Sequence, residues 1–179
     1  MKHLSSFSLR MLPCIYLATA TSLICRADEQ QSVKNSLIEY VSRAQTIKVL
    51  IMDSETGARV GYSGELAKCP ALKSNLCSFF KACKYESVPV PVAELSSYFA
   101  TNSFFVMQCV FPDRKKANFS YVGGYIHLSK SDSWSVITNE KLSDLSQHFK
   151  SLLDACSANA LTKVHFDQDE KSQQEAFFK

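Results

Sequence analysis

Residues 103–130, SFFVMQCVFPDRKKANFSYVGGYIHLSK, contain two long apolar runs that are separated by a short charged loop. Laid out as a strand, the first run places Phe105, Met107 and Cys109 on one face, and the opposite face is apolar as well. We expect the second run to fold back as an antiparallel strand, with Cys109 opposite Tyr121. A hairpin that is apolar on both faces is typical of the middle of a sheet or of a sheet covered by helices.

Hydrophobic periodicity predicts further elements on both sides of this hairpin. Strands are expected at Ile47–Met52, Ala58–Ser63, Trp134–Thr138 and Thr162–Phe166, and helices at Asp28–Thr46, at Leu66–Tyr85 and from Thr138 or Asn139 to Cys156. The hairpin at 47–63 is the shorter and less apolar of the two, so we expect it at an edge of the sheet. The predicted fold class is α+β: a mainly antiparallel sheet of about five strands around the central hairpin, flanked by helices and tied by one or two disulfides.

The N-terminus has the pattern of a secretory signal peptide. Lys2 and Arg10 precede the apolar segment MLPCIYLATATSLIC, and the chain becomes polar from residue 26 onwards. Small residues place the expected cleavage after Ala27, with Ala20 as an alternative; the apolar run of about 15 residues is short for an uncleaved anchor helix. The predicted organisation is a signal peptide at 1–27, one α+β domain at 28–166 and a polar tail at 167–179, and the predicted location is secreted or periplasmic.

Removal of the signal peptide changes the charge balance. The whole chain has 20 basic and 17 acidic residues. Lys2, Arg10 and Arg26 precede the expected cut and all acidic residues follow it, so the mature chain is formally neutral. A neutral chain has no overall basic field for nucleic acid. No later apolar run is long enough to cross a bilayer, so we expect no stable membrane insertion after cleavage.

Five cysteines follow the expected cleavage site: Cys69, Cys77, Cys83, Cys109 and Cys156. Export to an oxidising compartment favours disulfides, and the spacing matches no familiar zinc pattern. On a helix, Cys69 and Cys77 would lie about 12 Å apart along the axis, and Cys77 and Cys83 about 9 Å, beyond the reach of a disulfide at about 7 Å. We therefore expect the helix cysteines to bond to Cys109 and Cys156; the alternative is that the helix is broken. The odd number leaves a free thiol or an intermolecular bridge.

No catalytic or cofactor-binding motif occurs in the sequence, and we predict no cofactor and no metal site. A thiolate at Cys109 with His127 as its base is the most obvious catalytic pair, but the proposed register separates the two by about 20 Å along the sheet. His148 and His165 have no patterned carboxylate partner. The pair Gly123-Gly124 is expected to form a bulge or bend in the strand.

The loop of the central hairpin carries the most concentrated charge of the mature chain: Asp113, Arg114, Lys115 and Lys116. Its simplest interpretation is a solvated turn that keeps the hairpin soluble. The functional interpretation is a contact site for an acidic protein partner. Because the chain is small, exported and formally neutral, we expect a non-enzymatic binding protein, such as an inhibitor or an immunity protein that blocks a toxin or hydrolase. The alternative is a small secreted hydrolase or effector whose site is scattered along the sequence.

Overall fold

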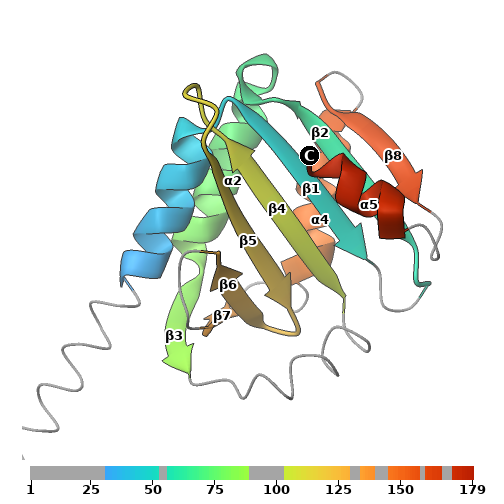
Figure 1. The fold of residues 1–179 in the computed structure, drawn as a ribbon. Coiled ribbons are helices and arrows are strands. Elements are labelled where there is room, and N and C mark those ends of the chain that lie inside the picture. The colour runs from blue at the N-terminus through green and yellow to red at the C-terminus, as the bar shows by residue number, and fades with distance from the viewer. Residues whose placement is uncertain are drawn as a thin grey trace, which may run out of the picture.

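A computed structural model describes residues 31–52, 56–88, 103–129, 134–139, 145–157, 160–166 and 171–179 (Figure 1). Eight strands form one sheet in the order β3-β7-β6-β5-β4-β1-β2-β8, and every neighbouring pair is antiparallel. Their bounds are β1 Thr46–Met52, β2 Arg59–Glu65, β3 Lys84–Val88, β4 Phe104–Val110, β5 Lys116–Val122, β6 Tyr125–Leu128, β7 Trp134–Thr138 and β8 Thr162–Phe166. The predicted signal peptide lies outside the described residues.

The structure confirms the α+β class and the mainly antiparallel sheet, but the prediction of about five strands is wrong. Two strands explain most of the difference. Cys83 has an extended backbone that ends the preceding helix, and β3 follows where we expected a last helical turn. Gly123 and Gly124 form a tight turn, with φ of 52° and 88°, that separates β6 from β5. The second apolar run is therefore two strands instead of one bent strand.

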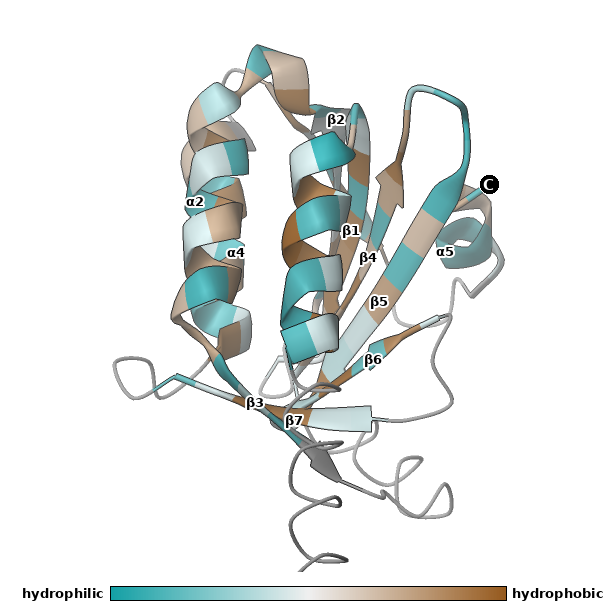
Figure 2. Cartoon of the chain, turned by 90° about the vertical axis from the view of Figure 1, so that its left-hand side faces the viewer, coloured by the Kyte–Doolittle hydropathy of each residue, from teal (hydrophilic) through white to brown (hydrophobic). Residues whose placement is uncertain are grey.

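Three helices cover one face of the sheet: residues 31–43, α2 Pro70–Ala82 and α4 Leu145–Ser157 (Figure 2). A short 3-10 helix, η1 Leu66–Lys68, leads into α2. Pro70 occupies the first turn of α2, where its missing N–H leaves no helical hydrogen bond unmade. Leu72, Leu76 and Phe80 repeat along α2 and are fully buried, as the periodicity predicted.

Aromatic rings fill the space between these helices and the central strands. The ring of Phe149 on α4 is stacked on Phe105 of β4, with centroids 4.2 Å apart, and Phe105 is stacked on Tyr121 at 4.9 Å. Phe80 of α2 meets Phe119 of β5 edge to face at 5.5 Å. Offset and edge-to-face pairs of this kind add to the stabilisation from burial alone. The central hairpin thus forms the sheet side of the core.

The opposite face of the sheet carries a fourth helix, α5 Lys171–Phe177, which lies over β1, β2 and β8 (Figure 1). Phe177 contacts the ring of Phe166 at a centroid distance of 5.6 Å. Gly61 lies beneath them, and a Cβ at that position would come within 2.7 Å of the Phe166 ring. Part of the segment that we expected to be a polar tail is therefore helical and packed on the sheet.

The register and position of the two predicted hairpins differ from the expectation. Cys109 pairs with Ala117 and Phe105 with Tyr121, so the central hairpin is shifted by four residues. Because four is an even number, the same side chains still face the core. The β1–β2 hairpin is not at an edge, because β1 pairs with β4 and β2 with β8. Within the described ranges, no helix has both the length and the apolar composition needed to cross a bilayer.

Candidate functional site

The tip of the β4–β5 hairpin is a three-residue loop with well-defined geometry. The backbone N–H of Arg114 donates to the carbonyl of Phe111 at 2.9 Å, which closes a turn through Pro112 and Asp113. The N–H of Phe111 in turn donates to the carbonyl of Lys115, also at 2.9 Å. Such a loop needs a residue with left-handed backbone after the turn, a position that usually holds glycine. In this chain that residue is Arg114, whose φ is 63°.

The left-handed conformation of Arg114 is unusual. Within the described part of the chain it is the sole residue other than glycine with a positive φ. An L-residue in this conformation costs about 1 kcal/mol, because its Cβ approaches the following carbonyl. Glycine would avoid the cost. The strain is a reason to look for a role of the Arg114 side chain that glycine could not fill.

The four charged residues predicted at this loop lie in three different settings. Lys115 forms an ion pair with Asp113 at 3.0 Å, and the backbone N–H of Lys115 also donates to that carboxylate. These hydrogen bonds lower the pKa of Asp113. Lys116 is already part of β5, and its Nζ donates to the main-chain oxygens of Phe178 and Lys179 at 3.3 and 3.2 Å. No ion pair joins the exposed Arg114 to another described residue.

Phe111 anchors the loop to the end of the helix at 31–43. Its ring lies 6.1 Å from that of Tyr40, and the guanidinium of Arg43 stands 5.3 Å above the Phe111 ring. Arg43 is also paired with Glu39 on its own helix. The base of the tip is therefore held by aromatic and cation–π contacts, while Arg114 is exposed.

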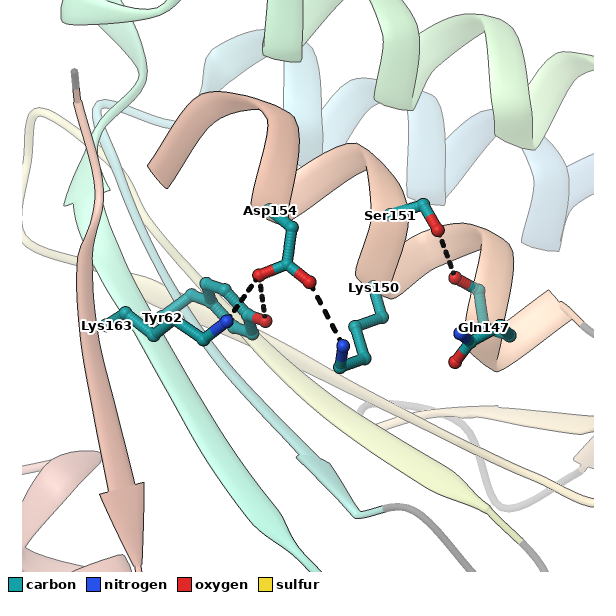
Figure 3. A network of polar contacts seen from close by, with 6 residues as sticks. All are labelled: Tyr62, Gln147, Lys150, Ser151, Asp154 and Lys163. Carbon is teal, nitrogen blue, oxygen red and sulfur yellow. Dashed lines mark hydrogen bonds and ion pairs between the residues drawn. The ribbon is translucent and has the colours of Figure 1, made fainter. Parts of the chain in front are cut away.

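A second group of charges lies around Asp154 on α4 (Figure 3). One carboxylate oxygen accepts from Nζ of Lys163 at 2.6 Å and from the hydroxyl of Tyr62 at 2.8 Å. The other accepts from Nζ of Lys150 at 3.0 Å. Lys163 also lies over the Tyr62 ring, 5.4 Å from its centroid. This Asp154 network joins α4 to β2 and β8.

The pKa values of the Asp154 network follow from its geometry. Partial burial by itself would raise the pKa of Asp154, but the hydrogen bonds from Lys163, Tyr62 and Lys150 outweigh it and lower the pKa to about 2. Burial and the bond to Asp154 raise the pKa of Tyr62. A carboxylate this acidic is a weak proton acceptor near neutral pH, and the neutral phenol stays protonated. The network is suited to holding α4 on the sheet.

All five cysteines predicted as disulfide candidates are free thiols in the structure, so the predicted one or two disulfides are not present. Two of them lie inside the core. Burial raises the pKa of Cys109 on β4 to about 12. Burial likewise raises the pKa of Cys83 to about 11, and that thiol donates to the carbonyl of Phe79 at 3.2 Å. Both remain protonated near neutral pH, which is the unreactive form of a cysteine.

The other three cysteines are half-buried around α2. Cys77 lies in the middle of α2, and burial raises the pKa of its thiol. Cys69 immediately precedes α2, and Cys156 lies in the last turn of α4. Burial raises the pKa of Cys156 to about 11, with a further contribution from a side-chain hydrogen bond with Cys69. Cys69 is therefore near enough to Cys156 to affect its pKa, although the two are far apart in the sequence.

His127 does not assemble with Cys109. The pairing of Ser120 with His127 and of Ala117 with Cys109 puts His127 and Cys109 on opposite faces of the sheet. The ring of His127 is stacked on Trp134 at 4.9 Å. His148 is stacked on Phe79 at 5.6 Å, and His165 is exposed on β8. The catalytic pair that the sequence suggested is thus separated by the sheet itself.

The described residues contain no group of three or more histidine, cysteine or acidic side chains that could hold a metal ion. Comparison of the chain with models of protein families, with curated proteins and with solved structures finds no match.

Sequence analysis located the hairpin tip but not the Asp154 network. Tyr62 and Asp154 are 92 residues apart, so no local pattern connects them. Lys150 and Asp154 do have the four-residue spacing of a helical ion pair, which is a weak signal because most such pairs are solvated surface pairs. The left-handed backbone of Arg114 had no sequence signal either, since arginine is not a residue that turns of this type select.

Proposed function

We propose that this chain is an exported, non-enzymatic protein that binds another protein, in the manner of an inhibitor or of an immunity protein that blocks a toxin or hydrolase. The observation that carries the proposal is the strained, exposed Arg114 at the tip of a braced hairpin. Its partner is a protein with an acidic cleft or patch. Export belongs to the same proposal and rests on the sequence of the N-terminus.

The geometry of the tip supports binding because the loop is organised in advance. The turn hydrogen bond, the Asp113–Lys115 ion pair and the contacts of Phe111 limit the conformations that the loop would lose in a complex. Within the tip, Lys115 is already neutralised by Asp113. Arg114 is the side chain left to engage a carboxylate, and its planar fork can do so with two hydrogen bonds.

The chemistry of the titratable groups favours a binding protein over a small hydrolase. The thiols with raised pKa values are poor nucleophiles at neutral pH. Asp154, with its lowered pKa, is a poor general base. His127 and His148 are stacked on aromatic rings. These groups have the properties of structural side chains.

The proposal is tested by capture with a charge-reversed control. The immobilised chain, the variant Arg114→Glu and the variant Lys81→Glu are each exposed to secreted and envelope proteins of the source organism. Lys81 is exposed in the last turn of α2, which leads into β3 at the end of the molecule away from the tip (Figure 2). Both substitutions change the net charge by the same amount, so a non-specific electrostatic contact should respond equally to the two.

The expected result is one protein that is retained by the wild type and by Lys81→Glu and that is lost with Arg114→Glu. Mass spectrometry identifies the retained protein, and its own activity is then assayed with and without the chain. Retention that is equal for all three proteins would exclude the tip as the binding site. Hydrolysis of the captured protein by the chain would favour the enzyme alternative.

A further inference from the structure

The structure places Cys69 and Cys156 at the same end of two packed helices. α2 and α4 lie against each other, and Phe79 late in α2 contacts His148 and Phe149 early in α4, at ring distances of 5.6 and 5.9 Å. The two helices are therefore antiparallel. The start of α2, at Cys69, consequently lies beside the end of α4, at Cys156.

The two side chains pack against the core at this shared end of the helices. Both residues are half-buried against the hydrophobic core, and the proximity of Cys69 contributes, after burial, to the raised pKa of Cys156. Half-burial leaves a sulfur within reach of a small oxidant. Neither residue lies in the middle of a helix: Cys69 separates η1 from α2, with φ of −136° and ψ of 71°, and Cys156 precedes a turn in which Ala160 donates to its carbonyl at 3.2 Å. Helix ends adjust more easily than helix interiors because fewer hydrogen bonds hold them.

The remaining thiols are placed less favourably for oxidation. Cys83 donates to the carbonyl of Phe79 and receives a contact of 3.9 Å from the amide of Asn139. Cys109 is fully buried on the core face of β4, and Cys77 on α2 is near enough to add to the raised pKa of Cys109. A bond between Cys77 and Cys109 would need an oxidant to enter the core. These residues serve as internal controls.

We propose that Cys69 and Cys156 are a redox-modified pair that forms an intramolecular disulfide between the start of α2 and the end of α4. The inference goes beyond the proposed binding function and does not depend on it. The sulfurs are not yet at bonding distance in the reduced structure, so one or both helix ends move when the bond forms. The bond closes a loop of about 90 residues, from 69 to 156, and long loops gain most from such a cross-link.

The oxidant that balances the reaction is a small disulfide such as glutathione disulfide. The Cys69 thiolate attacks one glutathione sulfur, which forms a mixed disulfide and releases one glutathione thiolate. The Cys156 thiolate then attacks the Cys69 sulfur and releases the second glutathione. Two electrons pass from the protein sulfurs to glutathione, and the two protons of the protein thiols end on the two released glutathione molecules. The reaction balances in the same way if the Cys156 thiolate attacks first and the Cys69 thiolate second.

The test uses the full chain, reduced and then incubated with glutathione disulfide under native conditions. Remaining thiols are alkylated in denaturant, and the digested protein is mapped by mass spectrometry. The expected result is a linked peptide that contains Cys69 and Cys156, while Cys77, Cys83 and Cys109 are recovered alkylated. Oxidation should also raise the thermal unfolding midpoint by roughly 5 to 10 °C.

Substitutions separate this bond from general effects of oxidation. Cys69→Ala and Cys156→Ala should each abolish the rise in the unfolding midpoint, whereas Cys83→Ala should retain it. All three are changes to a small residue, and thermal unfolding of the reduced variants shows whether each one folds. A linked peptide between Cys77 and Cys109 in place of Cys69 and Cys156 would overturn the inference. So would full alkylation of both residues in an oxidised chain that is still folded.

Discussion

The hairpin tip and the Asp154 network both contain several charged side chains, but these charges differ in their pairing and exposure. In the Asp154 network the carboxylate meets two lysines and a phenol within 3.0 Å, and the group is half-buried between α4 and the sheet. At the tip, Asp113 and Lys115 neutralise each other, while Arg114 adopts a strained backbone in the exposed loop. Charges that are satisfied within the fold indicate a structural role. A charge that is displayed at a cost in backbone strain indicates a role outside it.

The largest expected effect comes from charge reversal at the tip. Once a partner is in hand, Arg114→Glu should weaken binding by more than about 2 kcal/mol, the range of an interface hot spot, because a carboxylate then faces an acidic surface. Lys115→Glu should cost less, since Lys115 is already paired with Asp113. Isothermal titration calorimetry measures both, and urea unfolding checks that the fold is intact. Equal losses for the two variants would mean that the tip acts through its total charge.

Removal of the carboxylate from the Asp154 network should affect stability and not binding. Asp154→Ala leaves the Tyr62 hydroxyl and two lysines without their shared acceptor, at an expected cost of about 2 kcal/mol in the free energy of unfolding. Ser151→Ala is a matched control on the same helix, because its exposed hydroxyl donates only to the Gln147 carbonyl (Figure 3). It should change stability by less than about 0.5 kcal/mol. An Asp154→Ala variant with the free energy of unfolding of the wild type would show that the network does not stabilise the fold.

The two regions also mark what the sequence could and could not predict. Runs of apolar and β-branched residues located β1, β4 and β7, and helical periodicity located α2 and α4, because burial imposes those patterns directly on neighbouring residues. β3 was missed because Tyr85 follows the apolar face of α2 and gives no local sign that the helix has ended. Gly123 and Gly124 were interpreted as a bend because both a bulge and a turn select glycine.

Local sequence patterns could not predict contacts between residues that are far apart in the chain. The shared acceptor at Asp154 and the proximity of Cys69 to Cys156 depend on how α4 lies against β2 and α2. Helical rise excludes bonds among the helix cysteines, but the disulfides that we predicted from them to Cys109 and Cys156 are not present. Helix geometry alone could not decide which partner each one faces.

The Asp154 network should also appear in the pH dependence of stability. The pKa of Asp154 in the folded chain, about 2, lies below the ordinary value of 3.8. The ionised form is therefore favoured by folding, so its contribution is complete above about pH 4 and is lost as the pH falls towards 2. Because the side chain is about one third exposed, we expect a loss on the order of 1 kcal/mol.

Urea unfolding of the wild type and of Asp154→Asn at several values between pH 5 and pH 2 isolates this contribution. Other carboxylates titrate in both proteins, so the difference between the two curves belongs to Asp154. The difference should shrink as the pH falls. Parallel curves over the whole range would contradict the assigned pKa.

The smallest expected effect tests the strain at the tip, and its sign is opposite to that of the other substitutions. Arg114→Gly removes the cost of the left-handed backbone, about 1 kcal/mol. The more flexible glycine adds a conformational-entropy cost of about 0.5 kcal/mol on folding. The net effect is a stabilisation of roughly 0.5 kcal/mol. Lys115→Gly, one residue later, should destabilise, because Lys115 is not in the left-handed region and its bond to Asp113 is lost. Midpoints of urea unfolding resolve both changes. If Arg114→Gly is more stable than the wild type and yet fails to bind the partner, stability favours glycine at residue 114 and binding requires arginine. If Arg114→Gly is less stable, the backbone at the tip is not strained, and the main support for the proposed interaction site is lost.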